Sequence, residues 1–84
     1  MAEVIMYSTA YCPYCTKARD LLDRKGITYT DIRVDDQPDR RDEMITKSGR
    51  RTVPQIFING QHIGGCDDMY ALEEEGHLDK LLRG

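Results

Sequence analysis

The strongest local constraint on the fold is the dipeptide Asn59-Gly60, which lies between two short runs of strand-forming residues. Asn-Gly tolerates positive φ at both central positions of a two-residue turn, and this geometry joins neighbouring antiparallel strands. The flanking runs are Gln55–Ile58 and Gln61–Gly64. The sequence therefore predicts a β-hairpin over these residues.

A β-α-β unit is predicted before the hairpin. Val4–Ser8 is short, apolar and partly β-branched, which is typical of a buried strand. Residues 13–25 carry apolar positions at helical spacing, and Gly26 supplies a C-terminal stop. Residues 27–34 alternate between apolar and polar, and a helical crossover would make this second strand parallel to the first.

Further helices are predicted on either side of the hairpin. Pro38 and Asp39 are typical of a helix start, and Ser48-Gly49 of its end. The predicted order β-α-β-α-β-β-α indicates an α/β fold with a mixed four-stranded sheet and helices on both faces. With 84 residues and no repeat or linker, we expect a single domain over residues 1–84. Apolar faces for one or two C-terminal helices come from Met69, Leu72, Leu78, Leu81 and Leu82.

Two of the three cysteines flank the start of the first predicted helix. Cys12 directly precedes that helix, and Pro13 suits its first position. The free amides and the dipole of a helix N-terminus would stabilise a thiolate at Cys12. Cys15 lies one turn further on the same face, close enough for a reversible disulfide. We therefore expect Cys12 to be the attacking nucleophile and Cys15 the resolving thiol, with Lys17 and Arg19 as candidate sources of positive potential.

A metal site is the alternative interpretation of the same residues, because four side chains could bind zinc: Cys12, Cys15, His62 and Cys66. Structural zinc sites usually join two closely spaced ligand pairs across a short connection, and the gap here is much longer. His62 lies beside the predicted hairpin turn and is interpreted as a plain surface residue. We therefore expect no metal.

Charge and hydropathy narrow the class of partner. The formal net charge of −3 argues against a dedicated nucleic-acid binder. The first residues lack a basic start followed by a long apolar run, and no stretch approaches the length that crosses a bilayer. We expect a cytoplasmic protein in a reducing compartment, where a close cysteine pair indicates redox chemistry rather than a structural disulfide.

Three motifs resemble those of the dithiol glutaredoxins: Cys-Pro-Tyr-Cys at 12–15, Thr-Val-Pro at 52–54 and Gly-Gly-Cys-Asp-Asp at 64–68. The chain is most similar to the short bacterial type, which carries a third cysteine after the glycine pair. The resemblance spans nearly the whole chain and implies a thioredoxin-like fold. It implies reduction of protein disulfides and glutathione mixed disulfides, with glutathione as co-substrate, no tightly bound cofactor and a monomeric state.

The same resemblance implies how glutathione is held. A cis Pro54 would face the cysteines and leave the Val53 backbone free to pair with an extended peptide. Cys66 and Asp67, at a helix N-terminus, would bind the γ-glutamyl end, although from the residues alone Asp67 is a helix cap. Arg41 would reach the glycyl carboxylate. The full set of expected glutathione-binding residues is Tyr14, Arg41, Thr52, Val53, Pro54, Gly65, Cys66 and Asp67.

Two positions and two alternative functions stay open. Thr9 stands where many glutaredoxins carry a lysine, which removes one expected contact. Cys66 is interpreted as a small apolar filler, or as a site of secondary oxidation or glutathionylation.

One alternative function is an electron donor that is itself reduced by thioredoxin reductase, and the glycine pair before Asp67 argues against this function. The other is an iron–sulfur carrier in which Cys12 binds the cluster, and the stiff Pro13 argues against this second function.

Overall fold

The computed structural model describes residues 2–83, and within this range the predicted order of elements is confirmed. No helix in the described part of the chain is long and apolar enough to span a membrane. The elements are β1 (Val4–Ser8), α1 (Pro13–Arg24), β2 (Thr30–Arg33), α2 (Pro38–Ser48), β3 (Gln55–Ile58), β4 (Gln61–Gly64), α3 (Cys66–Glu74) and α4 (Leu78–Arg83).

The strands form one mixed sheet in the order β2-β1-β3-β4. β1 pairs with β2 in parallel, whereas β1 with β3 and β3 with β4 are antiparallel, so the predicted sheet is confirmed. The hairpin turn has φ of 51° at Asn59 and 79° at Gly60, as the sequence predicts. The Asn59 side chain also accepts a hydrogen bond from the Glu3 amide at 2.9 Å, which ties the turn to the start of β1.

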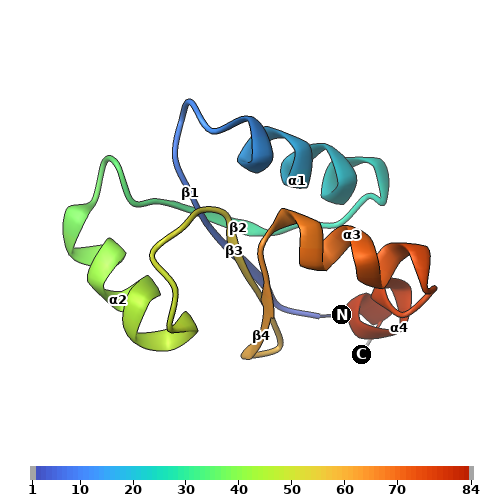
Figure 1. Cartoon of the computed structure of the whole chain (residues 1–84). Coiled ribbons are helices and arrows are strands. Elements are labelled where there is room, and N and C mark those ends of the chain that lie inside the picture. The colour runs from blue at the N-terminus through green and yellow to red at the C-terminus, as the bar shows by residue number, and fades with distance from the viewer. Residues whose placement is uncertain (1, 84) are drawn as a thin grey trace.

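Helices cover both faces of the sheet, because successive strand residues point to opposite sides. Met6 on β1 lies in a core with Leu22 of α1 and with buried residues of α3 and α4. Its neighbour Tyr7 lies in a second core with Met44 of α2 and Phe57 of β3. Figure 1 shows this division, with α2 on the lower left of the sheet and α1, α3 and α4 on the other side.

Glycines in the left-handed conformation end three of the described helices, α1 at Gly26, α2 at Gly49 and α3 at Gly76. Gly26 has φ of 69°, and the Ile27 amide reaches back to the Leu22 carbonyl at 3.0 Å, so α1 ends in a Schellman motif. Because the Ile27 amide is bonded back to α1, β2 is shorter than the predicted strand over residues 27–34. Only Thr30–Arg33 pairs with β1. Gly76, with φ of 76°, ends α3 in the same way and leaves two C-terminal helices rather than one.

The strand register brings three loops to one end of the sheet. Tyr7 near the end of β1 pairs with Gln55 at the start of β3, and Ile56 pairs with Gly64 at the end of β4. The segment before α1, the segment before β3 and the segment before α3 are therefore neighbours in space. These segments carry the three motifs singled out in the sequence.

Candidate active site

Cys12 is the N-cap of α1, and its own sulfur makes the capping hydrogen bond. Its backbone is extended (φ −94°, ψ 114°), and its Sγ accepts the Cys15 amide at 3.2 Å. Side-chain oxygens usually fill this role, so a sulfur there lies where an anion is stabilised by unpaired amides and the helix dipole. Cys12 is also partly exposed, which leaves the sulfur accessible to a second thiol.

Cys15 lies in a different environment from Cys12. It is fully buried on the first turn of α1. Burial, and secondarily the hydrogen bond to Cys12, raise the pKa of the Cys15 thiol to about 12, against smaller lowering effects from the Thr9 backbone and Arg19. The two thiols therefore differ in access, and the buried Cys15 thiol is held protonated, as expected for a resolving thiol.

The loop before β3 faces Cys12. The Val53–Pro54 peptide bond is cis, and the Cys12 thiol donates to the Val53 carbonyl across 3.7 Å. The buried Gln55 side chain holds this loop from below, because its Nε2 donates to the Thr52 carbonyl at 3.0 Å and to the Thr52 hydroxyl at 3.2 Å. The resulting site has the sulfur of Cys12 beside the main chain of the cis-proline loop.

His62 takes part in holding this loop, so its interpretation as a plain surface residue is wrong. Its Nε2 lies 2.7 Å from Gln55 Oε1, and its ring packs on Phe57 with centroids 5.0 Å apart. Burial, and secondarily the positive charge of Arg50, lower the pKa of His62.

Within residues 2–83 no group of three or more His, Cys, Asp or Glu side chains is placed to hold a metal. The four candidate zinc ligands therefore do not form one cluster.

A groove with a volume of about 320 Å³ opens next to the residues that surround Cys12 in space. It contains every expected glutathione-binding residue except Arg41, whose Nη1 instead donates to the Arg51 carbonyl at 3.4 Å. The lining residues are Tyr14, Arg50, Thr52, Val53, Pro54, Gln55, Gly65, Cys66, Asp67 and Asp68.

Asp68 is one of the groove residues that the sequence analysis missed. It accepts the Gly65 amide at 2.9 Å and Arg50 Nη1 at 2.9 Å, and these two contacts lower the pKa of its carboxyl. Asp68, at the third position of α3, is therefore the helix cap, and assigning the cap to Asp67 is wrong. An acid three residues after the N-cap is the capping-box pattern and could have been recognised. The Asp67 carboxylate makes no hydrogen bond or ion pair with another residue in the range 2–83.

The glycine pair is required by close packing. Gly64 has φ of 121°, and a Cβ there would lie 2.2 Å from Asp68 Oδ2. A Cβ on Gly65 would lie 3.3 Å from the Pro54 carbonyl oxygen. The glycines thus let the α3 N-terminus approach the cis-proline loop, which forms the two walls of the groove.

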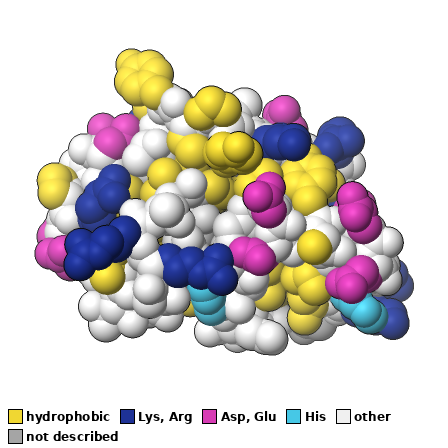
Figure 2. Space-filling view, viewed as in Figure 1, with side chains coloured by type: hydrophobic (Ala, Val, Ile, Leu, Met, Phe, Trp, Pro, Cys, Tyr) yellow, Lys and Arg dark blue, Asp and Glu magenta, His cyan; other side chains and the backbone are white. Residues whose placement is uncertain are grey.

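The two walls of the groove carry opposite charges. Arg50 lies on one wall, and Asp67 and Asp68 lie on the other, at the start of α3. Figure 2 shows the wider pattern, with Lys and Arg side chains gathered over α2 and the loop after it, and acidic side chains over α3 and α4. A ligand that has both cationic and anionic groups would match this arrangement.

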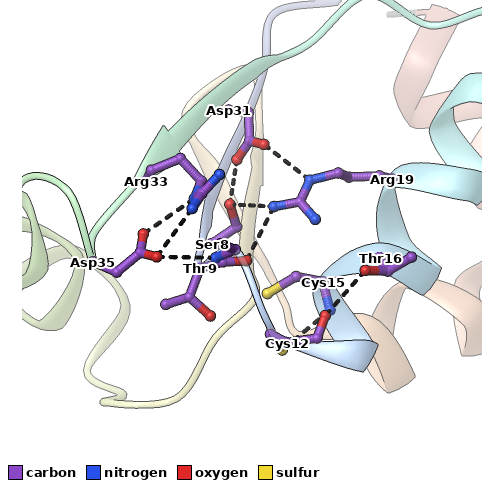
Figure 3. Close-up of polar contacts among 10 residues, drawn as sticks. Ser8, Thr9, Cys12, Cys15, Thr16, Arg19, Asp31, Arg33 and Asp35 are labelled. Atoms are coloured by element: carbon purple, nitrogen blue, oxygen red, sulfur yellow. Dashed lines mark hydrogen bonds and ion pairs between the residues drawn. The ribbon is translucent and has the colours of Figure 1, made fainter.

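A polar network anchors the segment between β1 and Cys12 (Figure 3). Arg19 Nη2 donates to the Ser8 hydroxyl at 2.9 Å and to the Thr9 carbonyl at 3.2 Å. Asp35, paired with Arg33, accepts the Ala10 amide at 3.1 Å. This segment, where Thr9 stands, is therefore held from both α1 and the chain after β2.

Comparison with known proteins adds to these findings. A family model described as Glutaredoxin matches residues 4–63. The chain is 53% identical over 83 residues to Glutaredoxin 3 of Escherichia coli (strain K12), covering 99% of this chain and 100% of that one. The crystal structure of a buckwheat glutaredoxin–glutathione complex has a TM-score of 0.90 at 34% identity, covering 98% of this chain and 77% of that one. The solution structure of glutaredoxin from Brucella melitensis has a TM-score of 0.85 at 54% identity, covering 98% of this chain and 89% of that one.

Proposed function

The chain belongs to the glutaredoxin family of glutathione-dependent thiol–disulfide oxidoreductases, and from this premise we propose that Cys12 and Cys15 are its reacting dithiol. We propose further that residues 1–84 form one glutaredoxin domain, and that its substrates are protein disulfides and glutathionylated proteins. The observation that carries the assignment is the accessible Cys12 sulfur at the N-terminus of α1, 3.2 Å from the Cys15 amide.

Reduction of a protein disulfide would begin at Cys12. Its thiolate attacks one substrate sulfur, the substrate disulfide breaks, and the other substrate sulfur leaves as a thiolate. Cys15 then attacks Cys12 in the mixed disulfide and releases the second substrate thiol. With a glutathionylated substrate, Cys12 alone suffices, because a second glutathione can resolve the intermediate.

Glutathione is proposed to lie along the groove with its sulfur at Cys12. Its backbone would pair with Val53, since the loop before Pro54 places the Val53 main chain beside the Cys12 sulfur. The γ-glutamyl carboxylate would bind the amides at the start of α3, and its ammonium group would meet Asp67. The glycyl carboxylate would reach Arg41, which lies at the Arg51 end of the loop.

The proposal is tested by turnover of hydroxyethyl disulfide with glutathione, glutathione reductase and NADPH. We expect the wild type and Cys15→Ser to turn over this small mixed-disulfide substrate, and Cys12→Ser to be inactive. Retained turnover in the Cys12 variant would contradict the assignment of the nucleophile.

The electron source is tested separately with an insulin-type protein disulfide. We expect reduction to be supported by glutathione with its reductase, and to require both cysteines. Reduction supported by thioredoxin reductase, but not by glutathione, would contradict the proposed co-substrate and favour the alternative electron donor.

A further inference from the structure

The Arg19 guanidinium is held on the Cys15 side of α1 by side chains of two strands (Figure 3). Its Nε lies 2.9 Å from Asp31 Oδ2 on β2, and its Nη2 donates to the Ser8 hydroxyl of β1 at 2.9 Å. The Ser8 hydroxyl in turn donates to Asp31. Arg19 follows Cys15 by four residues, so the two side chains lie on one helical face.

Little water separates this guanidinium from the resolving thiol. Ser8 and Cys15 are fully buried, and only 21% of the Arg19 side chain is exposed. In Figure 3 the Cys15 sulfur points toward Thr9, whose carbonyl accepts from the same guanidinium at 3.2 Å. Charges interact more strongly where water is excluded, so a charge that forms on Cys15 is stabilised here.

We propose that Arg19 is a positioning residue for the opening of the Cys12–Cys15 disulfide, where it stabilises the charge that develops on the Cys15 sulfur. The inference deepens the proposed dithiol function and depends on it. In this step a glutathione thiolate attacks Cys12 Sγ, and a bond forms between these two sulfurs. The Cys12–Cys15 bond breaks, its electron pair stays on Cys15 Sγ, and the Cys15 thiolate then takes a proton from water.

The cycle closes when a second glutathione thiolate attacks the glutathione sulfur bound to Cys12. This step releases oxidised glutathione and the Cys12 thiolate, so two glutathiones are oxidised and one protein disulfide is reduced. Cys15 does not take part in this second step. Arg19 is therefore needed only where Cys15 is the leaving group or the attacking group.

Arg19 is expected to change rates rather than the equilibrium. Because burial holds the pKa of Cys15 at about 12, the reduced protein carries a protonated Cys15 at neutral pH, with or without the guanidinium. The stable end states are then nearly unaffected by the charge of Arg19. Only the transition state, with charge forming on Cys15, loses stabilisation, and opening and closing slow by the same factor.

The experiment measures opening of the pre-formed Cys12–Cys15 disulfide under single-turnover conditions, with acid quenching, alkylation and mass spectrometry. Glutathione and 2-mercaptoethanol are used as attacking thiols in separate arms. Arg19→Gln is expected to slow opening about fivefold in both arms, the size of effect from losing one partly screened charge. Arg19→Lys keeps the charge and is expected to stay within about twofold of the wild type.

Three controls separate this role from a structural one. Arg24→Gln makes the same charge change on exposed α1 surface, where Arg24 hydrogen-bonds only to the Tyr70 hydroxyl and the Asp20 carbonyl among residues 2–83, and should match the wild type. The Cys12/Cys15 potential in glutathione buffers should be unchanged by Arg19→Gln. In a Cys15→Ser background, adding Arg19→Gln should leave turnover of hydroxyethyl disulfide at the Cys15→Ser level.

The inference is overturned if the disulfide of Arg19→Gln opens at the wild-type rate, or if that of Arg19→Lys opens as slowly as that of Arg19→Gln. It is also overturned if Arg19→Gln slows turnover of hydroxyethyl disulfide in the Cys15→Ser background. Should Arg19→Gln fail to fold, Arg19→Met removes the same charge with a side chain of similar reach, and is expected to slow opening about fivefold. An unchanged rate in Arg19→Met then counts against the inference. If glutathione does not reduce the wild type, the proposed function fails, and the 2-mercaptoethanol arm still decides the role of Arg19.

Discussion

The Cys12 sulfur accepts the Cys15 backbone amide at 3.2 Å, so one cysteine caps the helix that buries the other. The two thiols are three residues apart, yet one is accessible and one is completely covered. The unequal roles proposed for them therefore follow from the position of the motif at the start of α1. The dipeptide between the two cysteines helps to start the helix at this point, because it places a proline at the first helical position.

This inequality predicts selective alkylation. At pH 8 a thiol with a pKa of about 12 is ionised at about one part in 10⁴, so buried Cys15 should not react with iodoacetamide. Cys66 is buried as well, and burial raises the pKa of its thiol. We expect a single label on the folded protein, at Cys12 by peptide mapping.

The control for this experiment is the protein in concentrated guanidinium chloride, where all three cysteines should be labelled. Rapid labelling of Cys15 in the folded protein would show that the thiol is exposed by opening of the first turn of α1. That result would contradict the burial on which the roles of the two thiols depend.

Much of the fold could be predicted because its turns are encoded locally. Asn59-Gly60 fixes the hairpin, and Gly26 and Gly49 adopt the left-handed conformation where helices were expected to end. The shorter β2 could not be predicted, since it depends on a hydrogen bond from Ile27 back to the Leu22 carbonyl. A sequence pattern that favours extended structure does not indicate which of its residues pair with the neighbouring strand.

The candidate site was predictable where a motif is continuous and not where side chains meet across the fold. The motif segments line one groove, as their placement before α1, β3 and α3 requires. The Arg50–Asp68 ion pair joins residues 18 positions apart, and no periodicity indicates it. The contact of His62 with Gln55 depends on the register of β3 and β4, which sequence spacing leaves undefined.

Gly64 should be far less tolerant of alanine than Gly26. Both have positive φ, but a Cβ at Gly64 would lie 2.2 Å from Asp68 Oδ2, whereas a Cβ at Gly26 meets nothing within 4 Å. We expect Gly64→Ala to lower the free energy of unfolding by about 3 kcal/mol and Gly26→Ala by about 1 kcal/mol. Urea denaturation followed by circular dichroism gives both values, and equal losses would contradict the tight packing at Gly64.

His62 should make the protein less stable in mild acid. Its pKa is lowered in the folded state, so as pH falls through the ordinary value of 6.5 the unfolded chain binds the proton first. Stability is therefore expected to fall from pH 7 to pH 5, above the range in which the lowered pKa of the Asp68 carboxyl matters. In His62→Gln the decline over this interval should be smaller.

The matched control is His77→Gln, because His77 is exposed at the turn before α4. It should keep the wild-type decline between pH 7 and pH 5. Urea midpoints at several pH values measure the effect. A decline of the same size in His62→Gln and in the wild type would contradict the burial of a neutral imidazole at this position.

The two arginines near the groove should differ in their effect on glutathione. Arg41 is proposed to meet the glycyl carboxylate, whereas Arg50 is already paired with Asp68 at 2.9 Å. We expect Arg41→Gln to raise KM for glutathione about fivefold with kcat nearly unchanged, as for loss of a partly exposed charge-assisted hydrogen bond. Arg50→Gln should raise KM by no more than about twofold, since exposed ion pairs contribute little.

The control for general loss of positive charge is Arg51→Gln, because Arg51 is exposed and next to the same loop. A larger KM effect from Arg50 than from Arg41 would reassign the carboxylate to the arginine that lines the groove, and would require glutathione to displace Asp68 from its partner.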